Sequence, residues 1–383
     1  MGPPGSVDVD QARVRLQQGP RTKPPILELD ILSDQNTIRR ILSEGDNLSV
    51  DKQTVQWLLE SENPSVRYYA LKDLMDEPEN SSKLEREWKK IPNGPHVTAL
   101  FSRQQPDGGP GVHPYTKWTG AHWRLVSLVE QGMPPGHPKA KKMTDQVLDW
   151  LASEKHRTGI VTVEGRARVH ASMEGNALAS CSRLGLADDS RVRSLADGLV
   201  KWQWPDGGWN CDQRPDAGHS SFHESLLPLW GLTEYARATG KEGTYRISID
   251  RACEFFLKHK LFRSCSNGKI IKEEWLKLHY PAYWHYDILQ GALIVSRARR
   301  IGDSRAREAL DILLRRRRKD GRWQPGAYYW RRPDGGKGGR RSNREWWEPP
   351  STDVVDWGRS GPNEMITLNA LRVLKAAGRF NPI

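Results

Sequence analysis

The chain has 383 residues, and its 59 Lys and Arg outnumber its 47 Asp and Glu, which gives a formal net charge of +12. No window approaches the roughly 18 consecutive apolar residues of a membrane helix, and the first residues lack the apolar core of a signal peptide. The four cysteines have no C-x-x-C spacing, so they indicate neither a disulfide framework nor a zinc ribbon. Finger, RNP and helix-turn-helix patterns are missing too. We therefore expect a cytoplasmic protein with no transmembrane segment and no nucleic-acid partner.

The chain begins with a stretch that has no sustained periodicity. Residues 1–45 contain PPG, GP and KPP, which predicts a flexible N-terminal arm. Residues 55–76, VQWLLESENPSVRYYALKDLMD, then predict a pair of helices broken at Asn63-Pro64, because proline ends one helix and opens the next. A helical domain is therefore expected over residues 46–383.

Glycine turns recur along this domain at a nearly constant spacing. They end at Gly109, Gly159, Gly208, Gly268 and Gly321, at intervals of 50, 49, 60 and 53 residues. A period of about 40 to 60 residues is typical of stacked helical units. An amphipathic helix such as VLDWLASEK precedes each turn, and a helix with more than one apolar face, such as SSFHESLLPLWGLTEYA, follows it. Together with the first pair, this pattern predicts six helical hairpins.

The turn sequences resemble the QW motifs of the terpene cyclase and protein prenyltransferase superfamily, which includes the squalene-hopene cyclases. QWPDGGW at 203–209 is the best copy, QQPDGG at 104–109 is a second and DGRW at 320–323 a third. The resemblance covers roughly residues 50–380. It implies an all-α fold, an (α/α)6 toroid or barrel of six helical hairpins, in which the glutamines and tryptophans of the turns tie neighbouring hairpins together. An open solenoid is the alternative.

In such a toroid the first turns of the inner helices converge on a central cavity. We expect catalytic groups there because ionisable residues gather at these positions, although an acid in a first turn can also serve as a helix cap. The candidate acid-base residues are His223, Glu224, His285, Asp287, Glu174, Asp356 and Glu364. The candidate substrate-binding residues are His122, Trp123, His219, Tyr283, Tyr286 and Trp357.

A zinc site is a second possibility for the connector that precedes one inner helix. His219 and His223 are four residues apart and would share a face of a continuous helix, and Cys211 lies just before them. Sulfur and imidazole are zinc-type ligands, which gives Cys211, His223 and Asp287 as a candidate set. The alternative is a capping loop, with a serine at 220 or 221 capping the helix.

The zinc site of the protein prenyltransferases does not carry over to this chain. The beta subunits of that family hold zinc with an Asp and a Cys from one inner helix and a His from a later one. His223 falls near the place of that histidine, but MEGN at 173–176 stands where Asp-x-Cys would be needed. Any metal site must therefore be built from other residues.

The reaction expected from the resemblance is acid-base chemistry on a hydrophobic, isoprenoid substrate. Class II cyclases protonate an isoprenoid with an Asp-x-Asp-Asp element, which this chain lacks, so another acid must serve. HYPAYWHYDILQ sets His285 and Asp287 among aromatic residues, where the pKa of an acid can rise and the rings can stabilise cations. We expect a cyclase or isomerase type of enzyme. The alternatives are zinc-dependent group transfer or hydrolysis in the same cavity, and a non-catalytic helical-repeat binding protein.

A long connector at about 324–360 interrupts the repeat. Long connectors in compact domains are often lids. This one combines aromatic pairs with arginines, and its VVDWG segment would bring Asp356 and Trp357 to the mouth of the cavity. We expect a lid whose arginines attract an anionic group of a small hydrophobic substrate. The basic run at 315–319 is expected to be a solvated helix face.

Overall fold

The computed structural model describes residues 49–333 and 351–381. The described residues are mostly helical, which confirms the all-α class, and they include one antiparallel pair of short strands. The predicted arm at 1–45 and residues 334–350 of the predicted lid lie outside the described residues.

The elements follow one another as helices joined by turns. Residues 49–59 are helical. The later elements in chain order are α2 (Pro64–Tyr69), η2 (Ala70–Leu74), α3 (Ser82–Lys90), η3 (Ile91–Asn93), α4 (Pro95–Leu100), α5 (Ala121–Glu130), α6 (Pro138–Ala152), α7 (Glu154–Thr158), β1 (Val161–Val163), β2 (Arg166–Arg168), α8 (Ala171–Arg183), α9 (Ser190–Lys201), α10 (Phe222–Thr239), α11 (Glu242–Lys258), η4 (Glu273–Leu276), α12 (Ile288–Arg297), η5 (Ser304–Ala306), α13 (Arg307–Arg315) and α14 (Glu364–Ala376).

The predicted break at Asn63-Pro64 is confirmed. The side chain of Asn63 accepts a hydrogen bond of 3.0 Å from the backbone N–H of Ser65, and Pro64 occupies the first turn of α2. Proline is tolerated there because its missing N–H would have no partner in the helix.

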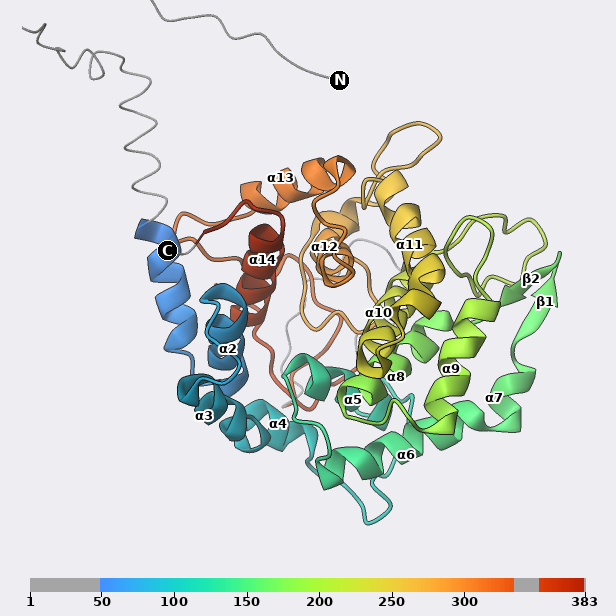
Figure 1. Ribbon diagram of the computed structural model, residues 1–383, viewed down its shortest axis with the longest axis horizontal. Coiled ribbons are helices and arrows are strands. Elements are labelled where there is room, and N and C mark those ends of the chain that lie inside the picture. The colour runs from blue at the N-terminus through green and yellow to red at the C-terminus, as the bar shows by residue number, and fades with distance from the viewer. Residues whose placement is uncertain (1–48, 334–350, 382–383) are drawn as a thin grey trace, which may run out of the picture. The chain divides into compact units, whose positions relative to one another are not determined.

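The most buried helices lie nearer the middle of the described unit, and the amphipathic helices surround them (Figure 1). Helices α5, α8, α10, α12 and α14 follow each other in space, since each packs against the next, and α14 packs against α2. The α8–α10 contact is the most extensive. It depends on two glycines, because a Cβ at Gly231 would lie only 2.6 Å from the carbonyl oxygen of Gly175.

The glycine turns hold neighbouring hairpins together. Gly207 has φ +99°, and a Cβ there would collide with the backbone of α11. Gln203 donates from Nε2 to the carbonyl oxygens of Gly207, at 2.8 Å, and of Ser248 on α11, at 2.9 Å. The indole N–H of Trp209 donates to a carbonyl oxygen at the end of α9, at 2.9 Å. These turn residues therefore have a structural role.

The last glycine turn contacts the helix at 49–59. Gly321 has φ +79°, and a Cβ there would collide with Oγ1 of Thr54. Beside it, Arg317 forms an ion pair with Asp51. The turn of the last hairpin thus packs against the first helix much as the turn at Gly207 packs against α11.

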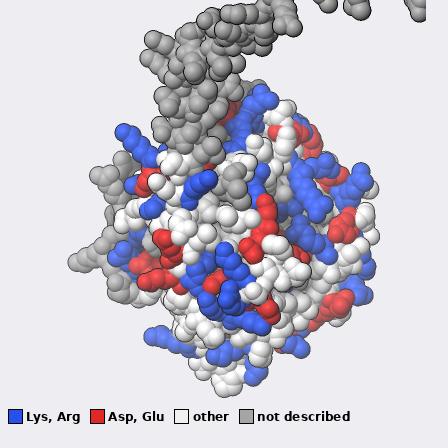
Figure 2. Space-filling model, turned by 60° about the vertical axis from the view of Figure 1, so that its left-hand side comes forward, with Lys and Arg blue, Asp and Glu red and all other residues white. Residues whose placement is uncertain are grey.

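The surface carries charges of both signs. Lysine and arginine are interspersed with acidic residues on the face that Figure 2 shows. In the predicted basic run at 315–319, Arg317 is partly buried in its ion pair and Arg318 lies 3.2 Å from the carboxylate of Asp320. Within the described ranges, no helix combines the length and the apolar character that crossing a membrane requires.

Candidate functional site

Three potential metal ligands meet where helices α8 and α10 begin. His170 immediately precedes α8, Cys211 lies on the connector from α9 to α10, and Glu224 is in the first turn of α10. One ligand atom from each residue lies within 4.8 Å of the other two. Among residues 49–333 and 351–381, this is the one group of three or more His, Cys, Asp or Glu side chains with such an arrangement.

Backbone hydrogen bonds bring these ligands together. The N–H of Val169 donates to the carbonyl oxygen of Asn210 at 3.0 Å, which places the next residues, His170 and Cys211, side by side. Two further hydrogen bonds fix the connector. The Asn210 side chain donates to the carbonyl oxygen of His219 at 2.7 Å, and the N–H of Ser221 donates to the carbonyl oxygen of Trp209 at 2.8 Å. The connector is therefore a built loop that presents Cys211 to the start of α8.

The carboxylate of Glu224 is oriented by the helix beside it. Its Oε2 accepts a hydrogen bond of 2.9 Å from the N–H of Ser172 in the first turn of α8. Its Oε1 faces His170, with 3.6 Å between Oε1 and Nδ1. The Ser221 side chain caps α10 by accepting from the N–H of Glu224 at 3.4 Å, which confirms the capping alternative for this serine.

The cluster favours a positive charge at its centre. Hydrogen bonding with Cys211, and then with Glu224, raises the pKa of His170 to about 10. The pKa of Tyr115 rises to about 12, first because of burial and then because of its electrostatic interactions with Glu224 and Cys211. The His170 side chain is 63% exposed, so the cluster opens to solvent. A cation held here would be reachable by a substrate, with the neutral Tyr115 hydroxyl nearby as a donor.

A second acid-histidine pair lies one turn further along α8. Oε1 of Glu174 is 2.7 Å from Nε2 of His156 on α7. His122 in α5 is buried, and its pKa falls to about 3, first because of burial and then because of the positive charge of His156. The Trp150 ring packs against both histidines. Glu174 and His122 therefore lie at the N-terminal ends of their helices, as predicted, and His156 is a partner of Glu174 that was not predicted.

Among the described residues, the predicted zinc set of Cys211, His223 and Asp287 is not brought together as one group of potential ligands. Nδ1 of His223 accepts a hydrogen bond of 3.1 Å from the backbone N–H of Tyr286, and burial lowers the pKa of His223 to about 4. Asp287 caps α12 by accepting from the N–H of Gln290 at 2.8 Å, and its other oxygen accepts from the N–H of His279 at 2.9 Å. Both side chains are used within the fold. His170 and Glu224 are the side chains that lie near Cys211 instead.

The centre of the inner helices is filled by the segment 277–287. Tyr283 stacks on Trp118 at 4.5 Å, and Tyr286 donates from its hydroxyl to a backbone carbonyl in the core. His285 stacks on Tyr329 at 3.7 Å, and burial keeps its pKa well below the ordinary value. The cavity left beside this segment measures about 30 Å³, which is room for one or two water molecules. Among the described residues, the space beside this segment is therefore too small for a larger ligand.

The predicted acid Asp356 points away from the interior. It is exposed, lies 3.1 Å from Nε of Arg332 and accepts from the N–H of Gly358. The buried acid of this segment is Asp353, whose carboxylate accepts from the Tyr283 hydroxyl at 2.5 Å and from the Trp357 indole N–H at 3.0 Å. Burial raises the pKa of Asp353 to about 6. Trp357 is thus buried beside Asp353, whereas the acid predicted in this segment was Asp356.

The remaining predicted residues have packing or capping surroundings. Glu364 accepts from the Ser61 hydroxyl at 2.8 Å, and burial raises its pKa. Trp123 is buried and donates to the carbonyl oxygen of Tyr115 at 3.1 Å. His219 is exposed and precedes α10, so it does not share a helix face with the later histidine as predicted.

The sequence analysis missed three residues of this site: His170, Tyr115 and His156. His170 stands directly before the inner helix, outside the first turn where candidates were sought. Tyr115 lies in a turn and His156 on an outer helix that the hairpin pattern treats as peripheral. The sequence RVHASMEGN contained a usable signal, because a histidine that precedes a helix start shares the position of the acids that were considered.

No protein-family model matches the chain, and no curated protein matches its sequence. Among solved structures, the apo type II terpene cyclase MstE from Scytonema is 15% identical, with 74% of this chain and 96% of that chain covered and a TM-score of 0.26. A variant of MstE in complex with geranylgeranyl dihydroxybenzoate, its substrate, is 16% identical, with 78% and 100% covered and the same TM-score. At this TM-score the likeness does not establish a common fold.

Proposed function

We propose that this chain is a metal-dependent enzyme, with zinc held by His170, Cys211 and Glu224 and with hydrolysis or group transfer as its reaction. The observation that carries the proposal is the convergence of a nitrogen, a sulfur and an oxygen ligand within 4.8 Å from three separate segments. Zinc takes this mixture of donors, and catalytic sites use three protein ligands and keep one position open.

The spacing of the ligands suits one small ion. Two ligands of a tetrahedral zinc lie roughly 3.3–3.8 Å apart when the bonds are about 2.0–2.3 Å long. The 3.6 Å between His170 Nδ1 and Glu224 Oε1 already falls in this range. The hydrogen bond from Ser172 to the second oxygen of Glu224 fixes the carboxylate, as partners outside the ligand set do in other metal sites.

The residues around the ligands could bind the substrate and transfer protons. A bound zinc would polarise a carbonyl or phosphoryl group and lower the pKa of water. The exposed side of His170 leaves a path for the substrate, and the Tyr115 hydroxyl stays protonated near neutral pH, so it can donate to an oxygen of the substrate. The pair of His156 and Glu174 can hold or pass a proton at the start of α8.

Elemental analysis of the purified chain tests the metal. We expect about one zinc per chain after reloading, and most of it should be lost in His170→Ala, Cys211→Ala and Glu224→Gln. Cys265→Ala is the matched control, because Cys265 is exposed and also lies beside a histidine. Circular dichroism checks that each variant is folded. Folded ligand variants that keep their zinc, or a wild-type chain that takes up none, would reject the site.

We also propose that residues 46–383 form a closed (α/α)6 toroid. Two observations support closure: α14 packs against α2, and the last glycine turn at Gly321 packs against Thr54 in the helix at 49–59. The first and last hairpins thus make the kind of contact that consecutive hairpins make. An open solenoid would leave both ends uncovered.

A second candidate function is acid-base chemistry on an isoprenoid substrate at the centre of the ring. Asp353 favours it, because a buried acid among Tyr283, Trp118 and Trp357 has a pKa of about 6 and faces aromatic rings. The cavity of about 30 Å³ is far smaller than pockets for ligands of this size, so segment 277–287 would have to move. Asp353 must also exchange a proton near pH 6, and a carboxyl that titrates near 4 rejects this candidate.

A further inference from the structure

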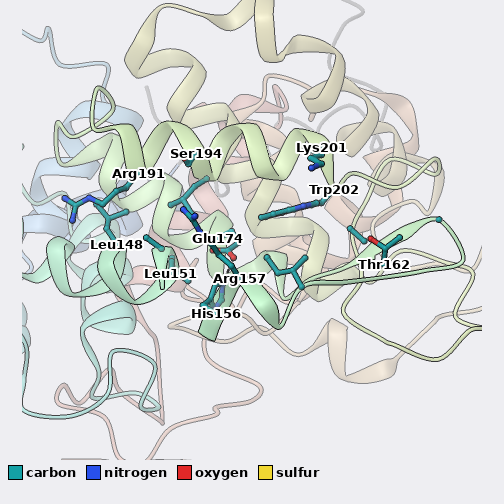
Figure 3. Close-up of a pocket in the computed structure, with 15 residues that line it drawn as sticks. Leu148, Leu151, His156, Arg157, Thr162, Glu174, Arg191, Ser194, Lys201 and Trp202 are labelled. Carbon is teal, nitrogen blue, oxygen red and sulfur yellow. Dashed lines mark hydrogen bonds and ion pairs between the residues drawn. The ribbon is translucent and has the colours of Figure 1, made fainter. Parts of the chain in front are cut away.

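A larger cavity, of about 600 Å³, lies between the outer helices and the β-hairpin. Its walls come from α6, α7, α9 and the two strands, and α8 reaches it from the inner side (Figure 3). Pockets for small molecules measure about 300–1,000 Å³. This cavity therefore has the size of a ligand site, whereas the central cavity does not.

One acceptor in the cavity lacks a donor. Glu174 lines the cavity with only 2% of its side chain exposed, and its Oε1 is bound to His156. Its Oε2 is buried without a hydrogen-bond partner among the described residues. Figure 3 shows Glu174 and His156 close together, with Arg157 beside them. A buried carboxylate oxygen without a donor is costly, so a donor from a ligand would stabilise it.

Two cations at the cavity also lack acidic partners. Arg157 and Lys201 line it and are exposed, and neither forms a salt bridge with a described residue. Arg191, which lines the same cavity, differs because Asp145, Asp149 and Asp189 all lie 2.7 Å from its guanidinium. The positive charge of Arg157 and Lys201 is thus available to an anion.

The rest of the wall is largely apolar. The side chains that supply this surface are Leu148, Leu151, Ile160, Leu195 and Trp202. An apolar ligand body would bury this surface and gain the corresponding hydrophobic free energy. The cavity therefore combines an apolar wall, a cationic rim and a buried acceptor.

We propose that this cavity binds a small amphipathic anion with three parts. Its anionic head meets Arg157 and Lys201, its apolar body lies along Trp202 and the leucines, and a hydroxyl group donates to Oε2 of Glu174. None of the three proposed zinc ligands lines this cavity, although His156 and Glu174 lie at its inner end and also adjoin the proposed zinc site. The test of the cavity therefore does not depend on a bound metal.

Calorimetric titration with three ten-carbon probes tests the proposal on the full chain with zinc removed. The probes are 10-hydroxydecanoate, decanoate and 1,10-decanediol, which have both polar groups, the anion only, and the hydroxyls only. We expect one site per chain for 10-hydroxydecanoate, with decanoate and the diol each about tenfold weaker, because a charged hydrogen bond or ion pair is lost. No binding of 10-hydroxydecanoate at millimolar concentration, or equal affinity for all three probes, would overturn the proposal.

Variants assign the two polar ends. Arg157→Gln combined with Lys201→Gln should weaken 10-hydroxydecanoate about tenfold and leave the diol unchanged. Both positions are exposed, so the variant should fold. Lys155→Gln is the matched control, because Lys155 is on the same short helix as Arg157 but does not line the cavity. Glu174→Gln should abolish the preference for 10-hydroxydecanoate over decanoate. A double variant that binds as tightly as the wild type places the anion elsewhere and refutes the site.

Discussion

The buried carboxyl of Asp353 should make the stability of the fold depend on pH in a direction opposite to that of most acids. Its side chain accepts four hydrogen bonds, from the N–H groups of Val354 and Val355, the Tyr283 hydroxyl and the Trp357 indole. Each of these donors favours the ionised form. Burial is nevertheless the larger effect, and it raises the pKa from 3.8 to about 6.

The size and sign of the effect follow from these values. Because the pKa is higher in the folded chain, the folded state binds the proton more tightly than the unfolded state does. The resulting stability is fully present below pH 3.8 and is lost as the pH rises through about 6. A difference of about two pKa units, at about 1.4 kcal/mol per unit, corresponds to roughly 3 kcal/mol.

Urea unfolding at a series of pH values from 4 to 7 measures this effect when wild type and Asp353→Asn are compared. Other carboxyl groups titrate in both proteins, so the difference between the two unfolding free energies isolates Asp353. The variant loses one acceptor, at a cost of about 1–3 kcal/mol that does not depend on pH. We expect the wild type to lose about 2.4 kcal/mol relative to the variant between pH 4 and pH 7, because part of the effect is already lost at pH 4.

Asp356→Asn is the control for this comparison, because Asp356 is exposed and three residues away. Its difference from wild type should stay nearly constant over the same range. A constant difference for Asp353→Asn, or one that grows in favour of the wild type as the pH rises, would mean that the four donors outweigh burial. It would also remove the acid from the isoprenoid candidate.

Two further predictions concern the packing of the inner helices and the glycine turns. Gly231→Ala should lower the free energy of unfolding by about 1–3 kcal/mol, because its Cβ would press on the Gly175 carbonyl. Thermal unfolding measures this loss. Gly243→Ala is the control and should be neutral or stabilising, because Gly243 in α11 has open space around it. Trp209→Phe should cost about 1–3 kcal/mol in urea unfolding, because a buried carbonyl at the end of α9 loses its donor. Trp57→Phe is the control, because Trp57 is partly exposed. If both variants lose the same free energy of unfolding, the hydrogen bond of Trp209 does not have the predicted role.

The helices and turns of this chain could be predicted because their signals are local. Apolar stripes mark each amphipathic helix, and the break at Asn63-Pro64 needs only the chemistry of proline. The contact of Gly321 with Thr54 joins opposite ends of the domain. Periodicity carries no information on such a contact, so the expectation of closure came from a family resemblance.

The candidate site was predicted in part for the same reason. Glu224, Glu174 and Cys211 could be named because polar residues near the start of apolar helices are conspicuous in the sequence. His170 could not be paired with Cys211, since the hydrogen bond between Val169 and Asn210 that aligns them joins two distant segments. The ligand set that we propose for zinc therefore required the tertiary structure.

The aromatic segment 277–287 shows why the packing between the inner helices could not be predicted from the sequence. Rings and histidines at the start of an inner helix are compatible with the wall of a cavity and equally with a plug, because both environments are apolar. The sequence does not indicate that Asp287 turns its carboxylate to His279 and Gln290, which holds the segment inward. The His170 side chain at the start of α8, by contrast, is 63% exposed. We therefore place the proposed zinc chemistry at the start of α8 and α10 and not at the aromatic segment.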